Sequence, residues 1–232
     1  ANKTIGQGGF QEMEQMNLFA DCVAYQEEVR DPSRIAETLN RVILQAKRAS
    51  GPAQINVPRD FWTQIIDIEL PKVVEFERPS GGTDALVHAA ELLSNAKFPV
   101  ILNGAGVVLS SGIAASAALA ERLDAPVCCG YQHNDAFPGS HPLFVGPLGY
   151  NGSKAGMELI SKADVVLALG TRLNPFSTLP GYGIDYWPKD AKIIQVDINA
   201  DRIGLTKEVT VGIVGDAKKV ACLLYTSPSP RD

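Results

Sequence analysis

The chain has 232 residues, of which 45% are hydrophobic and 20% charged, values that are ordinary for a globular protein with a buried core. The formal net charge of -5 argues against nucleic-acid binding, and no apolar run reaches the roughly 20 residues that a membrane helix needs. There is no apolar signal segment at the start, so we expect a cytoplasmic protein that does not contact a membrane.

Residues 1–66 predict the closing part of an α/β domain. Asp31 can cap a helix, and Pro32 suits its first turn. Apolar residues then recur at helical spacing as far as Ala46, which predicts a helix over this stretch. The turn at residues 50–52 ends this helix, and residues 54–58 predict a strand. Prolines, glycines and charges at residues 67–82 predict a linker, with a domain boundary near residue 80.

Residues 83–224 predict a second α/β domain, in which continuous apolar strands alternate with helices. That pattern is typical of a parallel sheet covered on both faces, as in Rossmann-like domains. Residues 130–152 and 170–188 are rich in Gly and Pro and predict long loops. The predicted helices cover residues 84–96, 113–123 and 154–161, and the predicted strands cover residues 100–102, 127–129, 165–169, 192–196 and 209–214.

The last residues break this pattern. A helix beginning at Asp216 is interrupted after Leu224 by a Ser/Pro-rich stretch, residues 225–232, which resembles translated adaptor sequence. We therefore expect a non-native tail there and exclude it from the fold. Because residue 1 is not Met, we also expect the chain to be an internal fragment of a longer protein.

Three loops at the carboxyl ends of predicted strands are candidate cofactor-binding sites. They contain Gly104 and Gly106, then Gly170, Thr171 and Arg172, and finally Asp197 and Asn199. Ligands of open parallel sheets bind at this edge, where glycines let backbone N–H groups approach a phosphate and an Asp can accept from a ribose. The alternative is equally open: the glycines form strand-to-helix turns, and Asp197 is only a cap.

No metal site is predicted. His133 and His141 flank residues 134–138 without a third ligand, and we expect them to make backbone hydrogen bonds. The four cysteines fit no zinc module, and Cys128 and Cys129 are expected to be buried thiols in a reducing compartment.

Six stretches together resemble the acetolactate synthase superfamily of thiamine-diphosphate enzymes: residues 9–12 (GFQE), 51–60 (GPAQINVPRD), 136–144 (AFPGSHPLF), 146–149 (GPLG), 170–173 (GTRL) and 196–199 (VDIN). Residues 1–66 resemble the end of its pyrimidine-binding domain, and residues 83–224 resemble its central domain. Within the superfamily, residues 1–12, 128–135 and 174–187 are most similar to the sulfoacetaldehyde acetyltransferases.

This resemblance implies an activity. The family converts sulfoacetaldehyde and phosphate into acetyl phosphate and sulfite. Its cofactors are thiamine diphosphate, which acts as the electron sink, and Mg2+. It also implies a homo-oligomer with the active site between subunits. Phe10 and Gln11 match residues that face the thiazolium ring across that interface.

Some parts of the family pattern are not in these residues. The activating glutamate is expected before residue 1, and the Gly-Asp-Gly…Asn motif for Mg2+ and the diphosphate is expected after residue 224, so this chain alone is expected to be inactive. Relatives that bind FAD carry a Met-His pair where this chain has Tyr150 and Asn151, which argues against flavin binding. The alternatives are an acetolactate synthase or oxalyl-CoA decarboxylase relative and, in a different class, a non-catalytic nucleotide-binding module.

Overall fold

The computed structural model describes residues 2–72 and 74–226. The chain forms two compact units, residues 1–76 and 77–232, which we call unit 1 and unit 2 and describe separately. Among the described residues, no helix is both long and apolar enough to cross a bilayer.

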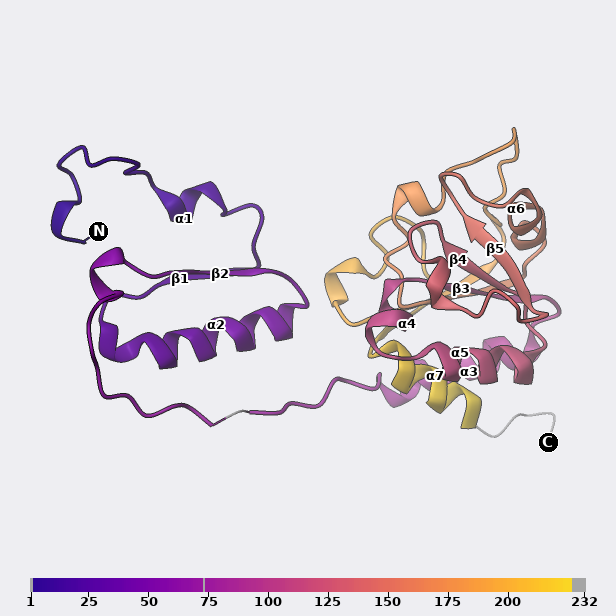
Figure 1. The fold of residues 1–232 in the computed structure, drawn as a ribbon. Coiled ribbons are helices and arrows are strands. Elements are labelled where there is room, and N and C mark those ends of the chain that lie inside the picture. The colour runs from indigo at the N-terminus through magenta and orange to yellow at the C-terminus, as the bar shows by residue number, and fades with distance from the viewer. Residues whose placement is uncertain (1, 73, 227–232) are drawn as a thin grey trace. The chain divides into compact units, whose positions relative to one another are not determined.

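Unit 1 is built around one strand–helix–strand motif (Figure 1). Strands β1 (Tyr25–Glu28) and β2 (Ala53–Asn56) pair in parallel, and helix α2 (Ile35–Ala49) connects them. As predicted, Asp31 caps the helical segment that starts at Pro32, because its side chain accepts from the N–H of Ser33; this segment is a 3-10 turn (Pro32–Arg34) that leads into α2. Ser50 ends α2 in a left-handed conformation. The short helix α1 (Gln15–Leu18) precedes the motif.

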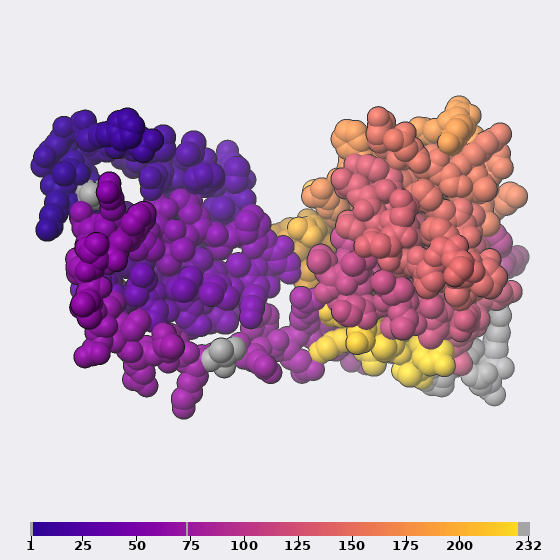
Figure 2. Space-filling view, viewed as in Figure 1, coloured from indigo at the N-terminus to yellow at the C-terminus, as the bar shows by residue number. Residues whose placement is uncertain are grey.

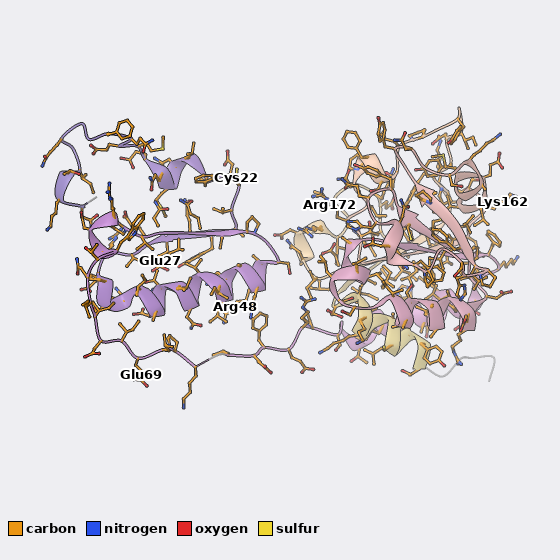
Figure 3. The ribbon with its side chains drawn as sticks, viewed as in Figure 1. Cys22, Glu27, Arg48, Glu69, Lys162 and Arg172 are labelled. Atoms are coloured by element: carbon orange, nitrogen blue, oxygen red, sulfur yellow. The ribbon has the colours of Figure 1, made fainter. Side chains whose placement is uncertain are left out.

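An ion pair joins the sheet of unit 1 to its helix. Glu27 on β1 accepts two hydrogen bonds from Arg41 on α2, at 2.8 and 2.9 Å, and a third from the hydroxyl of Tyr25. The Arg41 guanidinium holds the pKa of the Glu27 carboxyl below its usual value. Figure 3 shows Glu27 between the strands and α2, so the pair fixes the register of helix against sheet.

Unit 2 contains a six-stranded sheet in which every neighbouring pair is parallel, in the order β5-β4-β3-β6-β7-β8. Its strands and helices are β3 (Pro99–Asn103), β4 (Val127–Gly130), β5 (Phe144–Leu148), β6 (Val165–Leu169), β7 (Lys192–Asp197), β8 (Val211–Val214), α3 (Thr83–Asn95), α4 (Ala105–Leu109), α5 (Ile113–Leu123), α6 (Lys154–Ile160) and α7 (Ala217–Thr226). The predicted α/β fold class with a parallel sheet is confirmed.

Two apolar layers bury the faces of this sheet. Helices α3, α5 and α7 pack on one face, where Leu93, Leu119 and Val220 meet side chains such as Ile101 and Leu167. Figure 1 shows these three helices together, and in Figure 2 α7 (yellow) forms part of their outer surface. On the other face, α6 and the loop at 170–188 cover the strands. A parallel sheet is stable only when both faces are covered in this way.

The end of the predicted linker is attached to unit 2. Asp216 caps α7 by accepting from the N–H groups of Lys218 and Lys219, and its carboxylate also accepts from Arg78 at 3.1 Å. Ser80 pairs with Gly215 in an isolated antiparallel bridge. Because these contacts attach the end of the linker to α7 and β8, unit 2 begins at Glu77 and not at the start of α3.

The structure corrects several details of the predicted elements. Residues 130–152 are not all loop, because they contain β5, and the turn after β3 continues into α4. Residues 1–31 contain β1, which was not among the predicted strands. Tyr225 and Thr226 form the last turn of α7 and are not part of a separate tail. The rest of the predicted tail, residues 227–232, lies outside the described residues.

The second core layer contains a polar group without a partner. Tyr186 is 1% exposed, and among the described residues its hydroxyl makes no hydrogen bond of standard geometry. Burial raises the pKa of Tyr186 to about 12, and the nearby backbone of Gly149 lowers this pKa by a smaller amount. A buried hydroxyl in this state lowers stability, because the water that it bonded in the unfolded chain is not replaced.

Replacing Tyr186 with Phe is therefore expected to leave the free energy of unfolding unchanged or to raise it by up to about 1 kcal/mol. The ring keeps its packing, and the desolvated hydroxyl is removed. Urea denaturation of the wild type, Tyr186→Phe and Tyr186→Leu would test this, with Leu as the control that removes the ring. A loss of more than about 1 kcal/mol in the Phe variant would show that the hydroxyl is bonded after all.

Candidate functional site

Two predicted glycine loops meet at the centre of the carboxyl edge of the sheet in unit 2. From β3 the chain continues to β4 and β5 on one side, and β6, β7 and β8 lie on the other side, so β3 and β6 border the topological switch point. Gly104 and Gly106 follow β3, and Gly170 follows β6. This is the position where doubly wound sheets bind their ligands.

The two loops touch backbone to backbone. The N–H of Gly106 donates to the carbonyl of Gly170 at 2.8 Å. A Cβ on Gly106 would lie 2.7 Å from the Cα of Gly170, and a Cβ on Gly104 would lie 2.6 Å from the carbonyl oxygen of Gly170. Gly170 also has a φ of +61°. The glycines are therefore required for the close approach of the loops.

A buried glutamine holds the next part of this edge. Gln195, on β7, is 1% exposed, and its amide donates to the carbonyls of Thr171 and Arg202, both at 3.1 Å. Its side-chain oxygen accepts from the N–H of Gly204 at 2.9 Å. One side chain thus fixes the loop after β6 to the loop after β7. Gln195 was not among the predicted site residues, although a single polar residue within an apolar strand is a signal that identifies it.

The residues of these two loops differ in what they offer to a ligand. The hydroxyl of Thr171 accepts from the N–H of Leu173 at 3.2 Å, whereas the guanidinium of Arg172 is exposed and points outward in Figure 3. Asp197 is 5% exposed, and its carboxylate accepts from the N–H of Asn199 at 2.9 Å. Its Oδ1 lies 4.0 Å from Nη1 of Arg202. Asn199 in turn accepts from the N–H of Asp201.

These contacts give most of the predicted cofactor-binding residues a role in packing or capping. Among the described residues, Arg172 presents an exposed cation at this edge, and the carboxylate of Asp197 is engaged with its own loop. The contacts favour the capping alternative for Asp197. A nucleotide-binding role for these residues stays a prediction.

The turn at Tyr150 and Asn151 is also closely packed. A Cβ on Gly149 would lie 2.2 Å from the carbonyl oxygen of Phe176, to which the N–H of Tyr150 donates at 2.9 Å. The hydroxyl of Tyr182 donates to the carbonyl of Gly152 at 3.0 Å. The loop after β5, in which Asn151 has a left-handed conformation, is therefore fixed to the loop after β6.

In unit 1, the predicted catalytic residues Phe10 and Gln11 lie at the tip of a tight turn. The N–H of Glu12 donates to the carbonyl of Gly9 at 3.1 Å, and Gln11 has a φ of +62°, as in a type II turn. Phe10 is 95% exposed, and Gln11 is also exposed. The turn therefore presents both side chains outward.

The described residues contain no group of three or more His, Cys, Asp or Glu side chains that could hold a metal ion. His141 makes the backbone hydrogen bond that was expected of it, because its Nδ1 accepts from the N–H of Leu143. Cys128 and Cys129 are buried, as predicted, and burial raises the pKa of each thiol to about 12.

Comparison with known proteins identifies close relatives. The chain is 82% identical over 221 residues to a sulfoacetaldehyde acetyltransferase of Roseovarius nubinhibens, covering 95% of this chain and 37% of the relative. It is 33% identical over 226 residues to a probable acetolactate synthase large subunit of Methanocaldococcus jannaschii, covering 94% of this chain and 38% of that protein. The chain thus spans less than half the length of these relatives.

A solved structure has the same fold. Benzoylformate decarboxylase from Polynucleobacter necessarius superposes with a TM-score of 0.83 at 20% identity, covering 100% of this chain and 44% of that one. The model of the family described as thiamine pyrophosphate enzyme, central domain, matches residues 86–224, which is most of unit 2. The chain therefore belongs to the thiamine pyrophosphate enzyme family and contains its central domain.

Proposed function

We propose that the chain is part of a thiamine-diphosphate-dependent acetyltransferase that converts sulfoacetaldehyde and phosphate into acetyl phosphate and sulfite. The observation that carries this proposal is the 82% identity to a sulfoacetaldehyde acetyltransferase, which extends over both units. The identity to an acetolactate synthase relative is 33%, so the acetyltransferase is the better-supported activity.

In this proposal the two units have different tasks. When bound, thiamine diphosphate supplies the electron sink for cleavage of the carbon–sulfur bond. Phe10 and Gln11 are exposed on a tight turn and would face the reacting side of the cofactor in a homo-oligomer. Because Phe10 is apolar, it would exclude water there, and the amide of Gln11 could orient a polar group of the substrate.

Among the described residues there is no group of three or more His, Cys, Asp or Glu side chains that could hold a metal ion. We propose that Mg2+ and the diphosphate are held mainly by parts of the enzyme outside this sequence. The task of unit 2 is then to provide a rigid domain whose carboxyl-edge loops are fixed by Gly104, Gly170 and Gln195. We propose a cytoplasmic location for the enzyme.

The test is an assay of the complete gene product with thiamine diphosphate, magnesium, phosphate and sulfoacetaldehyde. We expect sulfite and acetyl phosphate to form in equal amounts and neither to form without thiamine diphosphate. Acetolactate formation from pyruvate, together with a co-purifying flavin absorbance, would instead assign the protein to the acetolactate synthases. The absence of all three products would overturn the proposal, and ADP or NAD binding measured by calorimetry would then favour a nucleotide-binding module.

A further inference from the structure

The turn that carries Phe10 and Gln11 is held by a single carboxylate. One oxygen of Glu12 accepts from the N–H of Gly6, and the other accepts from the N–H of Gly9 at 3.0 Å. The backbone of Glu12 closes the turn from the other side, since its N–H donates to the carbonyl of Gly9. The same residue therefore binds both ends of the glycine loop.

The electrostatics agree with this geometry. The two glycine N–H groups lower the pKa of the Glu12 carboxyl, so it is ionised at neutral pH and makes charge-assisted hydrogen bonds. Gly6 and Gly8 adopt positive φ angles, which glycine does without strain. Because glycines lose more conformational freedom on folding than other residues, this stretch needs a fixed partner to adopt one conformation.

The start of the loop is fixed independently. The N–H of Lys3 donates to the carboxylate of Asp60 at 3.1 Å, and the side chain of Gln7 donates to the carbonyl of Lys3. The segment that follows these anchors contains Phe10 and Gln11 and is bound to the carboxylate of Glu12 through Gly9. Both side chains are exposed, so packing within unit 1 does not set their orientation.

We propose that Glu12 is a positioning residue, which holds Phe10 and Gln11 in the orientation that the reaction requires. This inference rests on the proposed function, in which these two residues face the reacting side of the cofactor. Glu12 does not touch substrate in this proposal, and it acts only through the turn. An error of about 1 Å in the position of such a group can lower a rate by about 100-fold.

The test uses the complete enzyme and compares Glu12→Gln and Glu12→Ala with Glu14→Gln as the matched control. Glu14 is exposed in the same segment and makes no side-chain capping bond to α1. Gln at position 12 keeps one acceptor oxygen instead of two, and Ala keeps none. We expect kcat for sulfite release to fall about 10-fold in Glu12→Gln and about 100-fold in Glu12→Ala, with KM nearly unchanged. The control should stay within about twofold of the wild type.

Hydrogen–deuterium exchange gives a readout that does not depend on activity. Peptides covering residues 6–12 should exchange faster in both Glu12 variants than in Glu14→Gln, while the rest of the protein exchanges as in the wild type. Wild-type kcat in both Glu12 variants, or unchanged exchange at residues 6–12, would overturn the positioning role.

Failure of the proposed function gives a different pattern. If the wild type forms no sulfite, the proposed function fails, while the exchange comparison still decides whether Glu12 holds the turn. If the wild type is active but Phe10→Ala and Gln11→Ala retain full activity, the turn has no part in the reaction and the inference is wrong.

Discussion

Replacing Gly104 with Ala is expected to lower the free energy of unfolding of unit 2 by about 3 kcal/mol, because the added methyl group has no space. Its Cβ would lie 2.5 Å from the Cβ of Thr171 and 2.6 Å from the carbonyl oxygen of Gly170. Gly104 has φ −125° and ψ −168°, which Ala adopts without strain, so the effect is purely steric. The loops after β3 and β6 would have to move apart.

The measurement is urea denaturation followed by Trp187 fluorescence in a Trp62→Phe background. Trp187 packs against the second core layer of unit 2, whereas Trp62, in unit 1, is 71% exposed. Gly139→Ala is the control, because a Cβ there would meet no described atom within 4 Å. If Gly104→Ala and Gly139→Ala were equally stable, the two loops would not form the rigid contact described above.

Replacing Gln195 with Glu is expected to destabilise unit 2 by about 4 kcal/mol at neutral pH. The amide of Gln195 donates to two carbonyls in a buried position, and a carboxylate there would leave both without a donor and repel them. Burial raises the folded-state pKa of the new carboxyl above its unfolded value of about 4.3. The protonated acid can again donate to one carbonyl.

The sign of the pH dependence follows from that shift. A carboxyl with a raised folded-state pKa contributes stability that is fully present below about pH 4.3 and is lost as the pH rises through the folded-state pKa. The Glu variant should therefore approach the wild type in stability when the pH is lowered from 8 to 5. Gln195→Met, which has a similar length and no charge, should differ from the wild type by the same amount at both values. If the stability difference between the Glu variant and the wild type were also the same at both pH values, this account would be wrong.

The central strands could be predicted because their surroundings are uniform. Residues of β3 and β6 are apolar at nearly every position, since both faces of the sheet are buried. Strand β5 contains Gly146 and Pro147, which are typical of loops, and it was missed for that reason. Pro is tolerated there because β5 is an edge strand of the sheet.

The candidate site could be predicted only in part. The glycines, Arg172 and Asp197 were identified by their position after apolar strands, and the structure brings the first two glycine loops together. That Gly106 donates to Gly170 could not be read from the sequence, because the contact joins two loops that are distant in sequence. The role of Glu12 could not be read from the sequence, because its carboxylate accepts from the N–H groups of Gly6 and Gly9 only once the glycine loop has folded back on it.

The alternation of side chains along β4 has a further consequence for the adjacent cysteines. Cys128 packs into the layer with α6, and Cys129 packs into the layer with α5. Neighbouring side chains of a strand point to opposite faces, so the two sulfur atoms are separated by the sheet itself. An oxidant therefore cannot join them while β4 stays paired. The topology of the fold thus prevents a disulfide between these two adjacent buried cysteines until the strand leaves the sheet.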